Sequence, residues 1–446
     1  MSIEATPAPS FRKSRSALIL TFMGFFSMAT ISLAGTPPEN RFPEVAKLPS
    51  QVDLPDPLVM LSGTRVTTKE QWMRVRRPEL VALFEHYMYG HAPPAPATVA
   101  AVIEREDARL FDGRATKKEV TLTVGPPDCP KIHLLLIVPN ARKGPAPVFL
   151  GMNFCGNHAL LKDATVALPT CWMYDKYPGV KDHRATEAGR GSQSDVWAIE
   201  QSIERGYAVA TFYNGDIDPD RPDVREGIQG HFARGKYDWG TIAAWAWGLQ
   251  RVVDYLVTNH DIDKDRIAVV GHSRLGKAAL LAGGVDERIA LIIAHQAGCG
   301  GSAPSRSKVG ESVKQINDHF PHWFSRRFKE FNDHPDRLPF DQHCLVAIAA
   351  PRPVLFTNAV EDVWANPAGQ FDVLQAADAV YRLLELPGID ARETPPTSKL
   401  VDSPLGYHMR AGGHAMGKSD WLVFLEFADK HLPKARQATS RPPTRH

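Results

Sequence analysis

Cysteine is scarce in this chain, which has five cysteines among 446 residues. They are Cys129, Cys155, Cys171, Cys299 and Cys344. Five cysteines can form too few disulfides to stabilise a chain of this length. We therefore expect a hydrophobic core to stabilise the fold. None of them belongs to a C-x-x-C pair or to a His/Cys cluster with the spacing of metal ligands. We therefore expect no structural metal.

The chain also lacks an excess of charge of one sign. Its formal net charge is +2, and Lys and Arg are spread along the sequence rather than gathered into one stripe. A nucleic-acid partner requires a concentrated basic surface. We therefore expect no nucleic acid among the partners.

Long apolar runs are missing as well, with one exception at residues 17–34. This run follows a basic region at residues 12–15 and ends on the small residues Ser32-Leu33-Ala34, an order typical of a secretion signal. Its Thr and Ser residues make it a poor permanent membrane span. We predict a cleaved signal peptide over residues 1–34, the alternative being an uncleaved anchor. The mature protein would then be secreted or periplasmic and free of the membrane.

Strand patterns and helix patterns alternate along the remainder of the chain. Strands are predicted at 119–124, 132–138, 148–153, 208–213, 267–270, 289–295 and 354–358. Helices are predicted at 71–89, 241–259 and 420–431. Because the later strands are continuous apolar runs, we predict an α/β fold, a three-layer sandwich with a mostly parallel central sheet. This domain would cover residues 51–433, after a linker at 35–50 and before a disordered tail at 434–446.

Two long segments, 155–196 and 300–339, show no clear periodicity. Each follows the end of a predicted strand, where ligand sites of α/β proteins lie. Segments of this length without their own regular structure often form lids or binding walls. We predict that both line a binding site.

The most informative stretch is residues 267–277. A mostly β-branched run leads into Gly271-His272-Ser273, and an Ala/Leu-rich segment follows. This pattern predicts a strand, a sharp turn and a helix, with Ser273 exposed at the turn as a nucleophile. Backbone N–H groups at the start of the helix can stabilise a developing oxyanion. The usual G-x-S-x-G spacing is broken, because the second glycine comes late, at Gly276, and Arg274 follows the serine.

A serine nucleophile needs a base, and the base needs an acidic partner. His414 follows two glycines just before the last predicted helix, and we favour it over His408 and His431. The acid is expected in the loop after strand 354–358, at Asp362, with Glu361 as the second choice. Serine, acid and histidine would then follow the chain order of α/β-hydrolases.

Several motifs occur together within residues 50–432. They are Gly271-His272-Ser273-Arg274-Leu275-Gly276-Lys277, Gly151-Met152-Asn153-Phe154-Cys155-Gly156-Asn157-His158, Gly298-Cys299-Gly300-Gly301, Trp364-Ala365-Asn366-Pro367 and Gly412-Gly413-His414. As a set they resemble the glucuronoyl esterases of carbohydrate esterase family 15, in their bacterial form. The most specific part of this resemblance is the S-R-x-G-K element, which here is Ser273-Arg274-Leu275-Gly276-Lys277.

The resemblance implies a role for each matching residue. Ser273 would be the nucleophile and His414 the base, and Arg274 would line the oxyanion hole. Lys277 and Glu311 would bind ring hydroxyls of the glucuronate. Trp364 would hold the sugar through its indole.

One position departs from the family pattern. Gln296 stands where many members carry a glutamate, and glutamine cannot supply the charge that stabilises an imidazolium. Some bacterial members resemble this chain in carrying an acid two residues before the tryptophan, which here is Asp362. The resemblance therefore agrees with the acid chosen from the residues alone.

Taken together, the resemblance implies a serine esterase that acts on esters of glucuronic or 4-O-methylglucuronic acid, as in lignin–glucuronoxylan linkages. Such an enzyme would form a glucuronoyl-enzyme and need no metal or organic cofactor, and we expect a monomer. One alternative is an acetyl-xylan or general carboxylesterase on the same fold. The other is a non-catalytic carbohydrate-binding protein that kept Ser273.

Overall fold

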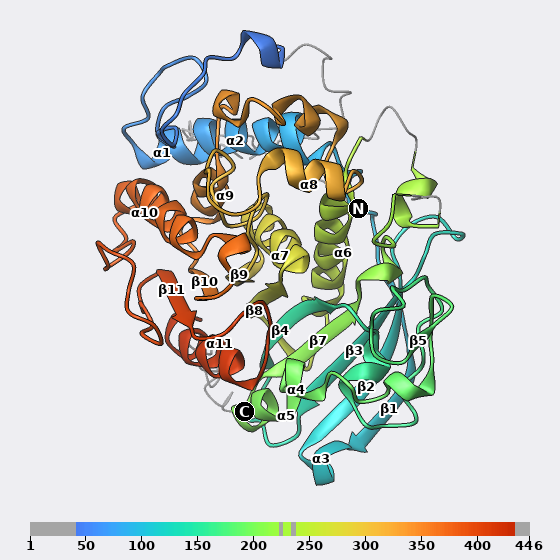
Figure 1. Cartoon of the computed structure of the whole chain (residues 1–446). Coiled ribbons are helices and arrows are strands. Elements are labelled where there is room, and N and C mark those ends of the chain that lie inside the picture. The colour runs from blue at the N-terminus through green and yellow to red at the C-terminus, as the bar shows by residue number, and fades with distance from the viewer. Residues whose placement is uncertain (1–41, 223–225, 233–237, 433–446) are drawn as a thin grey trace, which may run out of the picture. The chain divides into compact units, whose positions relative to one another are not determined.

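A nine-stranded sheet organises the chain (Figure 1), in a computed structural model that describes residues 42–222, 226–232 and 238–432. In spatial order the strands are β1 (Ala100–Arg109), β2 (Ala115–Thr123), β3 (Ile132–Pro139), β7 (Ala208–Tyr213), β4 (Ala146–Asn153), β8 (Ile262–His272), β9 (Ile289–His295), β10 (Val354–Ala359) and β11 (Leu405–Arg410). Neighbours from β1 to β7 pair antiparallel, and neighbours from β7 to β11 pair parallel. The predicted mostly parallel sheet is confirmed.

The central strands bury both of their faces. Val148 and Leu150 of β4 belong to one hydrophobic cluster, and Phe149 between them belongs to a second. Val269 and Val270 of β8 divide between the same two clusters. Because successive strand side chains point to opposite faces, this alternation explains why the strands are continuous apolar runs in the sequence.

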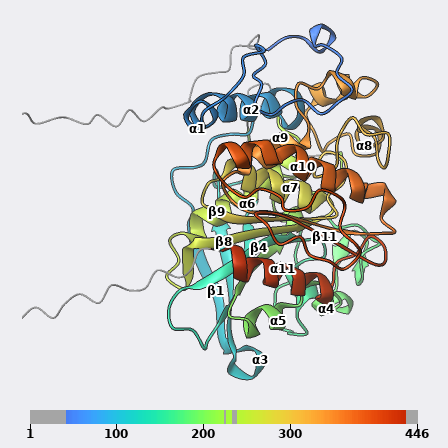
Figure 2. The ribbon, with the colours of Figure 1, turned by 90° about the vertical axis from the view of Figure 1, so that its left-hand side faces the viewer.

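Helices cover both faces of the sheet, which lies between two helix layers in Figure 2. The first layer contains α2 (Arg77–Phe84), α6 (Thr241–Leu256), α7 (Arg274–Val285), α9 (Gln342–Ala349) and α10 (Pro367–Leu383). The second contains α4 (Ser194–Trp197), α5 (Ile199–Glu204) and α11 (Lys418–His431). The predicted three-layer α/β sandwich is therefore confirmed.

The shorter elements are α1 (Lys69–Gln71), α3 (Leu110–Gly113), β5 (Val180–Lys181), β6 (Arg184–Ala185) and α8 (Val313–His319). The predicted helix at 71–89 is present as α1, a π-helical turn at Trp72–Arg76, α2 and a second π-helical turn at Glu85–Tyr89. All seven predicted strands are present. The sequence patterns missed the two outermost strands, β1 and β11, and the helix α10.

The packed domain begins before residue 51. Val45 and Leu48 lie in the segment expected to be a linker, yet both are buried in the hydrophobic core. The predicted signal peptide at 1–34, residues 35–41 and the predicted tail at 434–446 lie outside the described residues. No helix within the described ranges is long and apolar enough to cross a membrane.

Candidate active site

Four loops bring the candidate residues to one edge of the sheet, the carboxyl ends of its parallel strands. Ser273 directly follows β8 and Gln296 directly follows β9. Asp362 comes just after β10, and His414 comes just after β11. Because these four strands are adjacent and parallel, loops far apart in the sequence meet at this edge.

Ser273 occupies a strained turn between β8 and α7. Its φ of 56° and ψ of −127° lie in a region that residues with a side chain rarely adopt. Its N–H donates to the carbonyl of His295, at 2.8 Å, which ties the turn to the neighbouring strand. Gly271 is required here, because a Cβ at this position would lie 2.1 Å from the carbonyl oxygen of Leu275. The turn leaves Ser273 partly exposed ahead of the first N–H groups of α7.

His414 and Asp362 form a direct pair. Nδ1 of His414 lies 2.7 Å from Oδ2 of Asp362, and the carboxylate is buried while the imidazole is 43% exposed. Glu361, the second choice for the acid, is exposed. The competing histidines lie elsewhere: His408 is buried within β11, and His431 of α11 pairs with Asp402. The geometry therefore favours His414 as base and Asp362 as its partner.

Two histidines, the partly exposed His272 and the fully buried His295, pack behind His414. The ring of His272 lies 4.7 Å from that of His414 and 5.1 Å from that of His295, centroid to centroid. Burial lowers the pKa of His272 well below its usual value and that of His295 to about 4. Both rings are therefore neutral near pH 7 and add no positive charge beside His414. Because His272 immediately precedes Ser273, this contact places the His414 ring next to the serine turn.

Arg274 is held by a residue that the sequence patterns did not indicate, Asp220. The Arg274 guanidinium forms an ion pair with the Asp220 carboxylate and lies over the rings of Phe154, Phe320 and Trp323, at 5.0–5.8 Å. Burial by itself would lower the pKa of Arg274, but the facing Asp220 charge raises it overall. A permanent positive charge therefore stands beside Ser273.

Lys277 lies deeper in the same site. Its Nζ donates to the carbonyls of Ala297 and Cys299, each at 2.5 Å. Burial lowers its pKa, opposed by the nearby Glu311 carboxylate. An ammonium group has three donors, so one N–H remains for a ligand.

Glu311 and Trp364 are joined through the backbone. The N–H of Glu311 donates to the carbonyl of Trp364 at 3.0 Å. Burial raises the pKa of Glu311, opposed by Lys277 and by a hydrogen bond with the Trp364 side chain. Trp364 remains 49% exposed. The three residues expected to bind sugar therefore form one connected group.

The two aperiodic segments both contribute to this site. Segment 300–339 supplies Glu311, and it also supplies His322 and Trp323, which contact Asp220. Segment 155–196 supplies Tyr177, whose ring lies 6.3 Å from that of Phe154. Both segments therefore reach the residues around Arg274, in line with the walls expected from the sequence.

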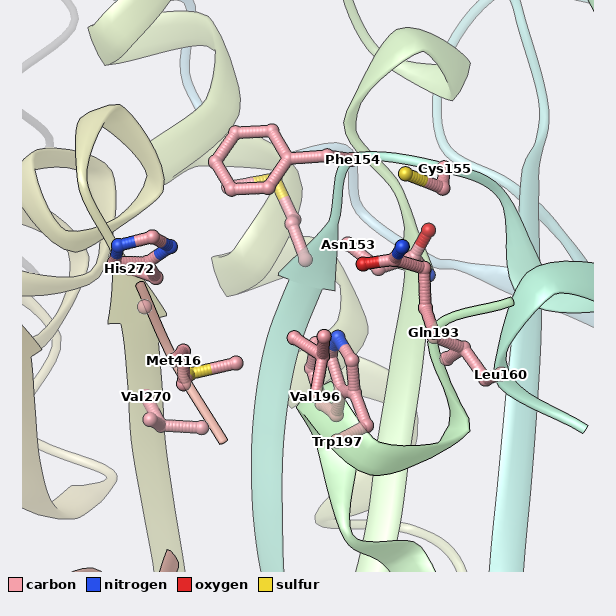
Figure 3. A pocket seen from close by; sticks show the side chains of 12 residues that line it. Asn153, Phe154, Cys155, Leu160, Gln193, Val196, Trp197, Val270, His272 and Met416 are labelled. Carbon is pink, nitrogen blue, oxygen red and sulfur yellow. The ribbon is translucent and has the colours of Figure 1, made fainter. Parts of the chain in front are cut away.

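A small cavity lies beside the serine turn, between the carboxyl ends of β4 and β8 (Figure 3). His272 lines one side, and Asn153, Cys155 and Gln193 line the other. Its volume of about 30 Å³ suits one or two water molecules but not a sugar. No group of three or more His, Cys, Asp or Glu side chains suited to a metal ion occurs in the described part of the chain.

Comparisons with known proteins point in one direction. The family model for fungal glucuronyl esterases matches residues 188–385. Carbohydrate esterase MZ0003, from an unknown prokaryotic organism, is 47% identical over 85% of this chain and 89% of its own length. The 4-O-methyl-glucuronoyl methylesterase 1 of Wolfiporia cocos is 30% identical over 82% of each chain. The solved structure of a promiscuous family 15 carbohydrate esterase from a marine bacterial metagenome is 46% identical, with a TM-score of 0.81, and covers 87% of this chain and 99% of its own.

Proposed function

Because this chain belongs to the glucuronoyl esterase family, carbohydrate esterase family 15, and is a carboxylic ester hydrolase, we propose that it hydrolyses esters of glucuronic or 4-O-methylglucuronic acid. The natural substrates would be the ester links between glucuronoxylan and lignin alcohols. The protein would act as a secreted or periplasmic monomer, without a metal or organic cofactor.

The observation that carries the proposal is the His414–Asp362 pair beside the strained Ser273 turn. Ser273 Oγ attacks the ester carbonyl carbon at C6 of the uronate while Nε2 of His414 takes its proton. Asp362 accepts the Nδ1–H of His414 and stabilises the imidazolium that forms. The backbone N–H and the guanidinium of Arg274 stabilise the oxyanion.

The second half of the reaction regenerates the serine. His414 returns its proton to the leaving alcohol, and a glucuronoyl ester of Ser273 remains. His414 then deprotonates a water molecule, which attacks the same carbonyl carbon. Uronic acid leaves, and Ser273 recovers its proton. Through both halves Lys277, Glu311 and Trp364 hold the sugar ring.

The test is hydrolysis of benzyl glucuronate against benzyl galacturonate by wild type, Ser273→Ala, Asp362→Asn and Glu361→Gln. We expect glucuronate-selective turnover, with at least a ~100-fold loss of kcat in the first two variants and a change of about twofold or less in Glu361→Gln. Turnover that survives Asp362→Asn and fails in Glu361→Gln would move the acid to Glu361. The absence of uronate turnover in wild type would contradict the substrate proposal.

One observation favours a broader ester specificity as the second candidate. The solved structure that is 46% identical to this chain is that of a promiscuous esterase. An acetyl-xylan or general carboxylesterase would not need a uronate site. The remaining hypothesis, a non-catalytic binding protein, is not favoured, because Asp362 supplies the carboxylate that Gln296 lacks.

Trp364→Ala separates these candidates. If Trp364 holds the sugar, the ratio of kcat/KM for benzyl glucuronate to kcat/KM for p-nitrophenyl acetate should fall about tenfold or more, through KM for the uronate. The acetate should be hydrolysed at nearly the wild-type rate. An equal effect on both esters would favour the general esterase.

A further inference from the structure

Gln296 is buried at the end of β9 in a strained conformation. It is 1% exposed and has a φ of 50°, in the left-handed region. Its backbone N–H donates to the carbonyl of Thr357 in β10, at 2.8 Å. The backbone is therefore fixed between two strands, and the side chain is directed at the loop that carries His414.

The Gln296 amide forms hydrogen bonds with the residue before His414 and with the residue after it. Its Nε2 donates to the carbonyl of Gly413, at 3.2 Å, and its Oε1 accepts from the N–H of Ala415, at 3.0 Å. The same oxygen lies 3.1 Å from Nε2 of His272, which must carry a proton to donate to it. Because the His272 ring packs against the His414 ring, one amide fixes the loop before the base, the loop after it and the ring beside it.

A carboxylate could not make the same set of bonds. The two backbone partners fix the orientation of the amide, because a carbonyl needs a donor and an N–H needs an acceptor. An ionised glutamate in the same place would turn an acceptor oxygen toward the carbonyl of Gly413. Two buried acceptor oxygens that face each other without a proton between them destabilise the folded state.

Other side chains also hold this loop, and Arg410 shares one acceptor with Gln296, the carbonyl of Gly413. His295 Nε2 lies 2.8 Å from the carbonyl oxygen of Ala415, and Arg410 donates to the carbonyls of Gly413 and Ala415. These contacts all go to carbonyl groups. The N–H of Ala415 and the ring of His272 both use Gln296 as their acceptor.

We propose that Gln296 is a positioning residue that holds His414 in reach of Ser273, and that the charge and the positioning of the base are divided between Asp362 and Gln296. The inference rests on the proposed function, because it assigns the base role to His414. This division of roles explains why position 296 can carry an uncharged amide, since Asp362 supplies the negative charge beside His414. Gln296 acts through the His414 loop and does not touch the reacting atoms.

The test compares Gln296→Met with Gln342→Met, a control at a buried glutamine of α9 that contacts Met88. Methionine keeps the length of the side chain and removes the amide. We expect kcat to fall ~10- to 100-fold in Gln296→Met with KM changed about threefold or less, because a small displacement of a catalytic group has an effect of this size. Gln342→Met should keep the wild-type kcat. A wild-type kcat in Gln296→Met would overturn the proposal.

A second arm asks whether position 296 can supply the charge. Gln296→Glu should lose activity by itself, and Asp362→Asn with Gln296→Glu should be no more active than Asp362→Asn. Recovery of kcat in the double variant to within about tenfold of wild type would show that a carboxylate at position 296 can serve as the acidic partner of His414. That result would overturn the division of roles proposed for Asp362 and Gln296.

A third readout separates this inference from the proposed substrate. A fluorophosphonate forms a bond from Ser273 Oγ to phosphorus and releases fluoride, with the proton taken by the base, whichever ester the enzyme prefers. Phosphonylation, measured by mass spectrometry, should be at least about tenfold slower in Gln296→Met than in wild type. Equal rates would overturn the positioning role alone. Absence of labelling in wild type would overturn the nucleophile assignment, and the positioning role with it.

Discussion

Asp220 shows how a single carboxylate organises the surroundings of Arg274. It is 4% exposed and accepts hydrogen bonds from Arg274, from His322 at 3.0 Å and from the Trp323 indole at 2.8 Å. Burial by itself would raise its pKa, but these partners lower the pKa overall. Asp220 is therefore ionised at neutral pH, and it fixes the Arg274 guanidinium against segment 300–339.

Asp220→Asn should weaken both catalysis and stability. The substitution keeps the shape of the side chain but leaves the buried charge of Arg274 without its partner, a change that typically destabilises by about 3–5 kcal/mol. We expect kcat to fall ~10-fold or more, and urea unfolding to show lower stability. Asp107→Asn, which removes an exposed pair with Arg109, should leave the urea midpoint nearly unchanged. A wild-type kcat in Asp220→Asn would show that Arg274 does not depend on this carboxylate.

The β8–α7 connection is the element that presents Ser273, the proposed nucleophile, partly exposed to solvent. Strand β8 ends at His272, and α7 begins at Arg274, so Ser273 alone makes the turn. The chain passes so close to itself that Gly271 before the turn and Gly276 after it have no room for a side chain. At Gly276, a Cβ would lie 2.9 Å from the carbonyl oxygen of Gly271 and 3.1 Å from the Ala297 side chain. The glycine that comes one residue late is therefore a packing requirement of this turn.

Gly271→Ala should disrupt the turn. The added methyl group would meet the backbone of Leu275, which cannot move without shifting the start of α7. Overpacking of this kind typically costs about 1–3 kcal/mol, and Ser273 would be displaced with the helix. We expect a lower Tm together with at least a ~100-fold loss of kcat. Gly144→Ala, where a Cβ meets nothing within 4 Å, should keep both values. Full activity in Gly271→Ala would contradict this account of the turn.

A two-sided hydrophobic core stabilises the molecule without disulfides. All five cysteines are free, and four of them are buried. Two clusters of buried side chains, one on each face of the sheet, provide the packing instead. This agrees with the expectation drawn from the scarcity of cysteine.

The burial of His295 should make the stability of the whole fold depend on pH. The pKa of His295 is about 4 in the folded state and about 6.5 when unfolded, so between these values the unfolded chain binds a proton that the native chain does not. Stability contributed by His295 is therefore present above about pH 6.5 and is lost as pH falls toward 4. The loss amounts to about 3 kcal/mol for this one group.

Urea unfolding of wild type and His295→Gln between pH 7 and pH 4.5 measures this effect. The free energy of unfolding of wild type should fall with pH, because His272 and His295 are both held neutral by burial. The fall should be shallower in His295→Gln, which has one buried imidazole fewer. Equal slopes for the two proteins would show that His295 takes up its proton without cost to the fold.

Much of this protein follows from its sequence alone. The central strands, the helix α6 and the serine turn were predictable because apolar periodicity and glycine placement are local properties that need no knowledge of distant residues. The same local patterns indicated Ser273, His414 and a carboxylate in the loop after β10. They missed β1, which lacks a buried apolar face, and they also missed α10.

Only the tertiary structure decided which residues work together. Strands β10 and β11 pair side by side and bring the loop after β10 to His414, where Asp362 meets the imidazole across 52 residues of sequence while Glu361 stays exposed. Gln296 reaches Gly413 across 117 residues, and Asp220 reaches Arg274 across 54. No local pattern records such contacts, because they are produced by the packing of parallel strands that lie side by side in the sheet although long connections separate them in the chain.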